Sequence, residues 1–230
     1  MTRKQRQSTT FENKKRIFIV DDHPIVREGL ITIINHEKDF EVCGEADEAR
    51  EAFKAISELN PDVVIVDIAL KSSDGIELTK NLRARYPTLP VIVLSIHDEL
   101  TYAERALRAG AQAYLMKEVV SENVVTAIRT VLSGEIYVSN TMGKKLLRKM
   151  AAAGKADTIS APIDSLSDRE LEIFRLIGQG YKPSKIAQSM HLSVKTVETY
   201  RARIKEKLNL ADADELLRYA IRWVSSEYEA

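Results

Sequence analysis

The sequence feature that most constrains the fold is a regular alternation of short apolar runs with amphipathic stretches between residues 16 and 133. Five of the apolar runs have the length of a strand, and three of them are continuous runs rich in β-branched residues. Such runs are typical of strands that are buried on both faces of a parallel sheet. The five predicted strands cover residues 17–20, 40–45, 63–66, 91–94 and 113–116.

Each predicted strand is followed by a stretch with the periodicity of an amphipathic helix. These stretches cover residues 24–35, 47–59, 74–85, 100–109 and 121–132. Asp47 is a candidate N-cap for the second of them. Five strand–helix units predict an α/β domain built on a five-stranded doubly wound parallel sheet with right-handed crossovers.

The rest of the chain has a different pattern, with no strand signal after residue 165. Ser167 and Glu170 have the spacing of a capping box, which predicts the start of a helix. Short helices are predicted at residues 142–150, 168–177, 183–190, 194–208 and 212–224. The last four predict a small all-α, four-helix domain. We therefore expect a basic tail at residues 1–15, an α/β domain at 16–133, a linker with a short helix at 134–163 and the helical domain at 164–230.

Composition limits the classes of protein to which the chain can belong. The single cysteine excludes an internal disulfide and any multi-cysteine metal site. No apolar run approaches the roughly 18 residues of a membrane span. The polar residues 1–15 do not form a secretory signal, so we expect a cytoplasmic protein with no membrane partner.

Charge is distributed unevenly along the chain. Residues 16–133 carry 13 basic and 20 acidic side chains, a net charge of −7. Residues 182–207 carry seven basic and two acidic side chains, a net charge of +5. An acidic body joined to a basic stripe predicts two functions in one chain.

Reactive side chains follow four of the predicted strands. Asp21 and Asp22 follow the first strand, Asp67 the third, Ser95 the fourth and Lys117 the fifth. Ligands of open α/β sheets bind at the carboxyl ends of the strands. Clustered carboxylates repel one another unless a cation lies among them, and hard oxygen ligands suit Mg²⁺. A carboxylate can also attack phosphorus to give an acyl phosphate. A metal and a lysine would then offset the negative charge on the phosphoryl oxygens.

Each of these residues has a simpler explanation when it is taken alone. An aspartate at a strand end usually forms a turn or caps a helix, and a lysine after a strand is normally solvated. Because all five positions fall at one edge of one sheet, we favour the functional interpretation. We expect His23, which follows Asp22, to pack at the start of a helix rather than to bind a metal.

Residues 16–133 resemble a response-regulator receiver domain in segments that match in order and spacing. The segments are Ile19-Val20-Asp21-Asp22-His23-Pro24, Val66-Asp67-Ile68-Ala69-Leu70, Val93-Leu94-Ser95 and residues 109–117, which end in Lys117. The resemblance implies a flavodoxin-like sheet in which Asp67 is the phospho-acceptor. It also implies a sensor histidine kinase as the phosphoryl donor and Mg²⁺ as the cofactor.

The resemblance further implies a role for each neighbour of the phospho-acceptor. The implied metal ligands are Asp21, Asp22, Asp67 and the backbone carbonyl of Ala69. Lys117 would pair with the phosphoryl group, Ser95 would hydrogen-bond it, and Tyr114 would change rotamer as the switch signal. Lys71 departs from the family pattern, which often has proline there, and this leaves the lifetime of the phosphoryl group open.

Residues 165–226 resemble a LuxR-type helix-turn-helix domain, so the whole chain resembles two-component regulators of the NarL/FixJ type. The matching pieces are residues 166–170, Ile186-Ala187, residues 192–198, Ile204 and Lys207-Leu208. On the predicted helix at 194–208, Val197, Ile204 and Leu208 share one inward face, which leaves the opposite face for the major groove. The candidate DNA contacts are Lys195, Thr196, Glu198, Thr199, Arg201, Ala202, Arg203 and Lys205.

The two resemblances together imply a DNA-binding transcriptional response regulator. A histidine kinase would phosphorylate it on Asp67, and the phosphorylated form would bind double-stranded DNA as a homodimer. Apolar surface on the last predicted helix, residues 212–224, is the expected dimer contact. We expect no independent substrate turnover and therefore no enzyme. Whether phosphorylation releases the helical domain or brings two copies together stays open.

Other functions fit the sequence less well. A haloacid-dehalogenase-like phosphatase would need a second aspartate where this chain has Ala69. A Rossmann nucleotide-binding protein would need a glycine-rich turn in place of Asp21-Asp22-His23-Pro24. A DNA-binding protein whose receiver is never phosphorylated stays open as an alternative.

Overall fold

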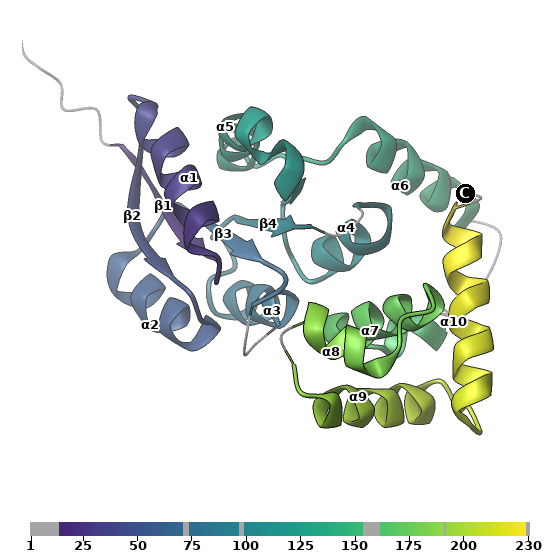
Figure 1. Cartoon of the computed structure of the whole chain (residues 1–230). Coiled ribbons are helices and arrows are strands. Elements are labelled where there is room, and N and C mark those ends of the chain that lie inside the picture. Colours follow the sequence, from purple (N-terminus) through teal and green to yellow (C-terminus); the bar gives the residue numbers. More distant parts are fainter. Residues whose placement is uncertain (1–13, 71–73, 97–98, 154–161, 191, 229–230) are drawn as a thin grey trace, which may run out of the picture. The chain divides into compact units, whose positions relative to one another are not determined.

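The computed structural model describes residues 14–70, 74–96, 99–153, 162–190 and 192–228 (Figure 1). Contacts divide the chain into two compact units, Met1–Lys145 and Leu146–Ala230. The division falls within α6 (Asn140–Ala153), which is longer than the helix predicted at 142–150. Lys71 lies outside the described residues, as do residues 1–13 of the predicted tail and residues 154–161 of the predicted linker. In the described part of the chain, no helix is both long and apolar enough to cross a membrane.

The N-terminal unit is built on a five-stranded sheet in which every pair of neighbouring strands is parallel. The strands are β1 (Lys15–Val20), β2 (Phe40–Ala46), β3 (Val63–Asp67), β4 (Val91–Ser95) and β5 (Ala113–Met116). Their order across the sheet is β2-β1-β3-β4-β5. This confirms the predicted fold class for this part of the chain.

Helices cover the sheet on both faces. They are α1 (Pro24–His36), α2 (Ala49–Leu59), α3 (Gly75–Arg85), α4 (Glu99–Arg108) and α5 (Val120–Leu132), with a short 3₁₀ turn at Lys117–Val119. Helix α1 packs against α5, whereas α3 contacts α2 and α4. The core is formed by β-branched strand residues such as Ile19, Ile65 and Ile92 together with Ile34 of α1 and Ile128 of α5.

The start of α2 differs from the prediction. The N-cap residue is Glu48 rather than Asp47, and its side chain makes no capping hydrogen bond. The buried residues Ala52 and Ile56 hold this helix on the sheet, so packing rather than a cap determines where it starts. By contrast, α3 has a true side-chain cap, because the carboxylate of Asp74 accepts hydrogen bonds from the first turn of the helix.

The first residues of the predicted linker belong to the N-terminal unit. The amide of Tyr137 donates to the carbonyl of Gln112 at 2.8 Å, and the amide of Tyr114 donates to the carbonyl of Tyr137 at 3.2 Å. The hydroxyl of Tyr137 lies 3.1 Å from Oδ1 of Asn123 on α5. Tyr137 thus lies along the outer edge of β5, beside the residue that the sequence predicts to be a switch.

The C-terminal unit is entirely helical over its described residues. After a 3₁₀ turn at Pro162–Ser165, the helices are α7 (Asp168–Gly178), α8 (Pro183–Ser189), α9 (Val194–Lys207) and α10 (Ala213–Tyr228). The capping box at the start of α7 is confirmed, because Ser167 and Glu170 exchange side-chain-to-backbone hydrogen bonds. Helix α7 packs against α9 and α10, and α8 packs against α9, which is the predicted helix-turn-helix arrangement.

Candidate functional site

Parallel pairing brings the reactive side chains to one edge of the sheet. Asp67 is the last residue of β3, Ser95 is the last residue of β4, and Asp21 and Lys117 directly follow β1 and β5. The pairing of Val20 with Val66 and of Asp67 with Leu94 aligns these strand ends. The chain runs from β1 outward to β2 on one side and back to β3 on the other, so the residues lie where strand order reverses.

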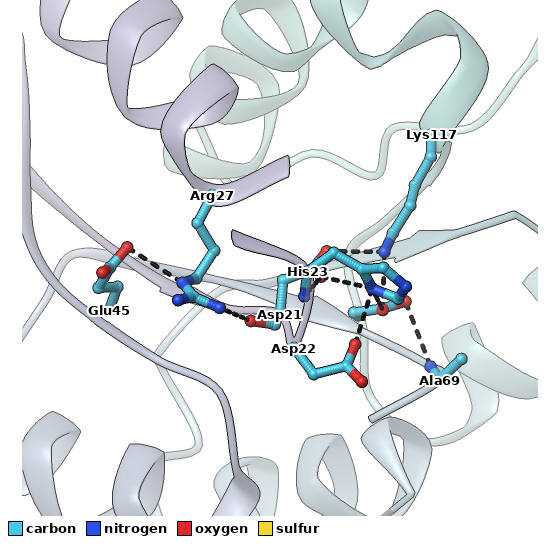
Figure 2. A network of polar contacts seen from close by, with 8 residues as sticks. Asp21, Asp22, His23, Arg27, Glu45, Ala69 and Lys117 are labelled. Carbon is cyan, nitrogen blue, oxygen red and sulfur yellow. Dashed lines mark hydrogen bonds and ion pairs between the residues drawn. The ribbon is translucent and has the colours of Figure 1, made fainter. Parts of the chain in front are cut away.

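Asp67 is almost fully buried at the centre of this edge (1% exposed). The ammonium group of Lys117 donates to Asp67 Oδ2 at 2.7 Å, and the backbone amide of Ala69 donates to Asp67 Oδ1 at 3.2 Å. Figure 2 shows Lys117 reaching down to the acidic residues from the opposite side to Ala69. The structure thus brings together the predicted phospho-acceptor, lysine and Ala69.

Lys117 is shared between two carboxylates. Its ammonium nitrogen also lies 2.7 Å from Asp21 Oδ2. Burial raises the pKa of Asp67 above its usual value, and the negative charge of Asp21 adds to this, while Lys117 offsets part of it. Burial disfavours the charged form of Lys117, but the carboxylates of Asp67 and Asp21 outweigh it and raise the pKa of the lysine. The pocket therefore carries more negative charge than one lysine balances.

The carboxylates meet the requirement for a cation site. Asp22 Oδ1 is buried and accepts no hydrogen bond from any residue that the structure describes, and Asp21 Oδ2 shares the ammonium of Lys117 with Asp67. One oxygen from each of Asp21, Asp22 and Asp67 and one nitrogen of His23 lie within 4.8 Å of one another. Buried carboxylate oxygens without donors are costly unless a cation binds them. The donor set is compatible with a hard divalent ion such as Mg²⁺.

Two residues that the sequence analysis did not consider fix the position of Asp21. Arg27 of α1 donates to the backbone carbonyl of Asp21 at 2.6 Å, and its Nε lies 3.2 Å from a carboxylate oxygen of Glu45 on β2 (Figure 2). The sequence gives only a weak signal for Arg27, since an arginine on the first turns of a helix is usually solvated. Only the register of β1 with β2 places Glu45 beside it.

The start of α3 approaches the backbone of Asp67 very closely. A Cβ atom on Gly75 would lie 2.0 Å from the carbonyl oxygen of Asp67, so only glycine fits at the start of α3. The amide of Gly75 donates to the carbonyl of Ile68 at 3.0 Å, which ties the start of α3 to the end of β3. Gly75 is a further residue that the sequence analysis missed, although a glycine directly after a helix cap is a recognisable signal of close approach.

The two predicted switch residues are both buried. Ser95 and Tyr114 are each 1% exposed. Tyr114 pairs in register with Val93 of β4, two residues before Ser95. The structure therefore brings Ser95 to the acidic edge and holds the Tyr114 ring inward. The rotamer change of Tyr114 stays a prediction.

The second candidate site is the outer face of α9. Val197 and Ile204 are fully buried and Leu208 is nearly so, as the helical pattern predicts. Of the candidate DNA contacts, the exposed ones are Lys195, Glu198, Thr199, Ala202 and Arg203, and the partly exposed ones are Thr196, Arg201 and Lys205. All eight lie on α9, which starts at Val194 and is capped by Ser193.

Some charges on this face are engaged within the C-terminal unit. Arg201 forms an ion pair with Glu198 at 2.8 Å, one turn earlier on the helix. Lys207 instead turns away to Glu170 of α7, with its nitrogen 2.6 Å from Glu170 Oε2. The guanidinium of Arg203 lies 6.0 Å from the centre of the Tyr200 ring. Lys195 and Arg203 are thus the exposed cations of the candidate set.

Comparisons with known proteins match both units. The family model described as "Response regulator receiver domain" matches residues 17–129, and the model described as "Bacterial regulatory proteins, luxR family" matches residues 164–220. Oxygen regulatory protein NreC of Staphylococcus epidermidis (strain RP62A) is 35% identical over 211 residues, which cover 90% of this chain and 97% of the relative. NreC of Staphylococcus aureus (strain MRSA252) is 36% identical over 210 residues, with the same coverage.

Solved structures also match. A LuxR-family two-component response regulator from Aurantimonas is 32% identical with a TM-score of 0.56, over 60% of this chain and 99% of that one. RcsB from Salmonella enterica serovar Typhimurium, bound to a promoter in the presence of the phosphomimetic BeF3⁻, is 26% identical with a TM-score of 0.56, over 90% of this chain and 98% of that one. A structure of two RcsB dimers bound to two parallel DNAs is 25% identical with a TM-score of 0.55, with the same coverage.

Proposed function

We infer how this chain works from one premise: it belongs to the two-component response regulators that join a receiver domain to a LuxR-type helix-turn-helix domain. The family consists of DNA-binding transcription factors, which confirms the expectation that the chain is not an enzyme. Its receiver domain implies a histidine kinase as partner.

We propose that Asp67 accepts the phosphoryl group. The observation that carries this proposal is the position of the Asp67 carboxylate, buried at the sheet edge and 2.7 Å from the ammonium of Lys117. In the transfer, an oxygen of Asp67 attacks phosphorus, the bond from phosphorus to the histidine nitrogen of the kinase breaks, and that electron pair leaves with the imidazole. Lys117 then stays beside the phosphoryl oxygens and offsets part of their charge.

We propose that the same pocket binds Mg²⁺. The carboxylates of Asp21, Asp22 and Asp67 and the backbone carbonyl of Ala69 would hold the ion. A bound Mg²⁺ would supply positive charge against the phosphoryl oxygens. Arg27 keeps Asp21 in place through its backbone carbonyl. The buried Oδ1 of Asp22, which accepts no hydrogen bond from any described residue, supports this role.

Ser95 and Tyr114 are proposed to convert phosphorylation into a change of surface. The hydroxyl of Ser95 would hydrogen-bond the new phosphoryl group, and the space that it leaves would favour the inward ring of Tyr114. Tyr137 lies along β5 next to Tyr114, so the change would reach the segment that leads into α6.

On the DNA side, α9 is proposed to enter the major groove with Thr199 and Ala202 near base edges and Lys195 and Arg203 near phosphates. The likeness to RcsB bound to promoter DNA supports this docking. Two such units would pair through α10, where Leu217 and Ile221 are 39% and 44% exposed. The RcsB dimers seen on DNA support binding as a dimer.

Intact-mass measurement tests the phosphorylation step. The protein is incubated with acetyl phosphate and Mg²⁺ and then weighed, with the Asp67→Asn variant treated in parallel. The proposal predicts a gain of one phosphoryl group in the parent chain only. A parent chain without any adduct would instead indicate a DNA-binding protein whose receiver is never phosphorylated.

A further inference from the structure

His23 occupies a different position from the one that its sequence context predicts. It is the N-cap residue of α1, yet its side chain makes no capping hydrogen bond and is 60% exposed rather than packed. Its Nδ1 lies 2.7 Å from Asp22 Oδ1, 3.1 Å from Asp21 Oδ1 and 3.8 Å from Asp67 Oδ2. Figure 2 shows the imidazole ring of His23 beside Asp21 and Asp22. A nitrogen donor therefore joins the oxygen donors of the pocket.

The contact between His23 and Asp22 is close without being a hydrogen bond. Asp22 Oδ1 is buried and accepts no hydrogen bond from any described residue, although the imidazole nitrogen is 2.7 Å away. The Nδ1 atom instead shares a hydrogen bond with Asp21 Oδ1 at 3.1 Å. Its separation of 2.7 Å from Asp22 Oδ1 is close to the spacing of neighbouring ligands around one ion, which is about 3 Å for metal–ligand bonds of about 2.1 Å. The four donor atoms also lie within 4.8 Å of one another. His23 thus has the placement of a ligand.

We propose that His23 supplies an imidazole nitrogen to the cation site and shifts its preference from Mg²⁺ toward a borderline transition ion of the Ni²⁺ class. The reason is ligand chemistry: Mg²⁺ prefers oxygen and water, whereas imidazole favours the later first-row divalent ions. This inference rests on the proposed function, because it concerns the same pocket. It adds that the identity of the bound ion depends on a residue outside the carboxylate set.

The test compares His23→Asn with His36→Asn in full-length protein without a polyhistidine tag. Asparagine is among the best N-cap residues, so His23→Asn removes the imidazole while keeping the start of α1. His36 is an exposed histidine at the other end of the same helix, which makes it a matched control for adventitious Ni²⁺ binding. Dissociation constants for Ni²⁺ and Mg²⁺ are measured by titration calorimetry for each protein.

The expected result is a change in selectivity. In His23→Asn the ratio of Ni²⁺ affinity to Mg²⁺ affinity should fall by about tenfold or more, the loss typical of a residue that supports a metal site. In His36→Asn the ratio should equal that of the parent chain. An unchanged ratio in His23→Asn would overturn the proposal.

Pulsed electron paramagnetic resonance of bound Mn²⁺ gives a direct readout of the ligand. Nitrogen modulation of the Mn²⁺ echo should be present in the parent chain and in His36→Asn, and absent in His23→Asn. Equal modulation in all three proteins, or none in the parent chain, would contradict ligation by His23.

The proposal can fail without the proposed function failing. Suppose that Mg²⁺ binds and that Asp67 gains its phosphoryl group from acetyl phosphate, while His23→Asn leaves the ratio of Ni²⁺ affinity to Mg²⁺ affinity unchanged. In that case only the role of His23 is wrong. If the parent chain binds neither ion and forms no adduct, both the His23 proposal and the phosphorylation proposal are wrong.

Discussion

At the scale of single residues, the carboxylate of Asp67 contacts the ammonium of Lys117 and the amide of Ala69, and Asp21 shares the lysine with it. The sequence could predict this grouping, because the carboxyl ends of parallel strands meet at one edge. It could not predict that His23 lies beside the carboxylates or that Arg27 donates a hydrogen bond to the backbone carbonyl of Asp21. Both depend on side-chain rotamers at the start of α1, for which the sequence pattern gives no rule.

One residue-scale prediction concerns the stability that the receiver loses by burying the carboxylates of the acidic pocket. Asp22→Asn removes a buried charge whose Oδ1 has no hydrogen-bond donor, so the metal-free receiver should become more stable by about 1 kcal/mol or more. Its affinity for Mg²⁺ should fall. Calorimetric unfolding in EDTA and Mg²⁺ titration measure the two effects.

The matched control for Asp22 is Asp62, whose carboxylate has donors. Burial opposes its charge, but the Arg16 amide and Lys15 outweigh it and hold the pKa of Asp62 below its usual value. Asp62→Asn should therefore destabilise the receiver. If both substitutions destabilise it equally, the crowding of carboxylates in the pocket is not a source of strain.

A second residue-scale prediction concerns the contact of Gly75, at the start of α3, with the Asp67 backbone. Gly75→Ala would place a Cβ 2.0 Å from the Asp67 carbonyl oxygen, and we expect a loss of about 2 kcal/mol or more of receiver stability. Gly29→Ala is the matched control, because Gly29 is an exposed residue of α1 with nothing within 4 Å of the added atom. The Gly29→Ala receiver should be more stable than the parent by about 0.5–1 kcal/mol, because alanine has a higher helix propensity than glycine. Equal effects at the two glycines would contradict the close approach.

At the scale of elements, the strands could be predicted almost to the residue, since buried parallel strands are continuous apolar runs with clear ends. The helix starts were predictable where a side-chain cap or a proline supplies the signal, as at Ser167 and Pro183. The start of α2 was missed at Asp47, where packing of Ala52 determines the start. Pairing of Tyr137 with the edge of β5 was not predictable, because one isolated residue carries no periodic pattern.

An ion pair between elements leads to a pH-dependent prediction for the C-terminal unit. Burial opposes the charge on Glu170, but Lys207 of α9 and the Ser167 amide outweigh it and hold the pKa of Glu170 below its ordinary 4.5. A lowered pKa in the folded state adds stability that is present above pH 4.5 and is lost as the pH falls through the lower folded value.

Glu170→Gln should therefore lower the free energy of unfolding of the C-terminal unit by about 1–3 kcal/mol at neutral pH. This difference from the parent chain should shrink as the pH drops below about 4. The single tryptophan, Trp223, packs against Phe174 of α7, so its fluorescence reports unfolding of this unit. Glu206→Gln on the exposed side of α9 is the control and should change stability by less than about 0.5 kcal/mol. A pH-independent difference for Glu170→Gln would show that the ion pair is not its cause.

At the scale of the whole molecule, opposite charges are segregated between the acidic receiver and the basic stripe at residues 182–207. The sequence alone predicted this division, because charge counts need no structure. It could not predict that Arg201 and Lys207 are engaged in ion pairs, which leaves fewer cations for DNA than the count suggests.

This difference predicts the salt dependence of DNA binding. Arg203→Ala should reduce the steepness of the plot of log affinity against log salt by about 0.9, the value for one lost phosphate contact on duplex DNA. Lys80→Ala, an exposed lysine of α3 in the receiver, should leave the slope unchanged. The measurement is fluorescence anisotropy on a mixed-sequence duplex at several salt concentrations. Identical slopes for all three proteins would remove Arg203 from the DNA contacts.

The most direct test of the central claim, that phosphorylation of Asp67 controls DNA binding, is the affinity of the two states for one DNA site. The site is first selected from a random duplex pool with protein phosphorylated by acetyl phosphate, and binding is then measured for the parent chain and Asp67→Asn with and without the phosphoryl donor. We predict that phosphorylation raises the affinity of the parent chain by about tenfold or more, a coupling of about 1.4 kcal/mol, and leaves Asp67→Asn unchanged. Equal affinity of the unphosphorylated and the fully phosphorylated parent chain for this site would contradict the claim.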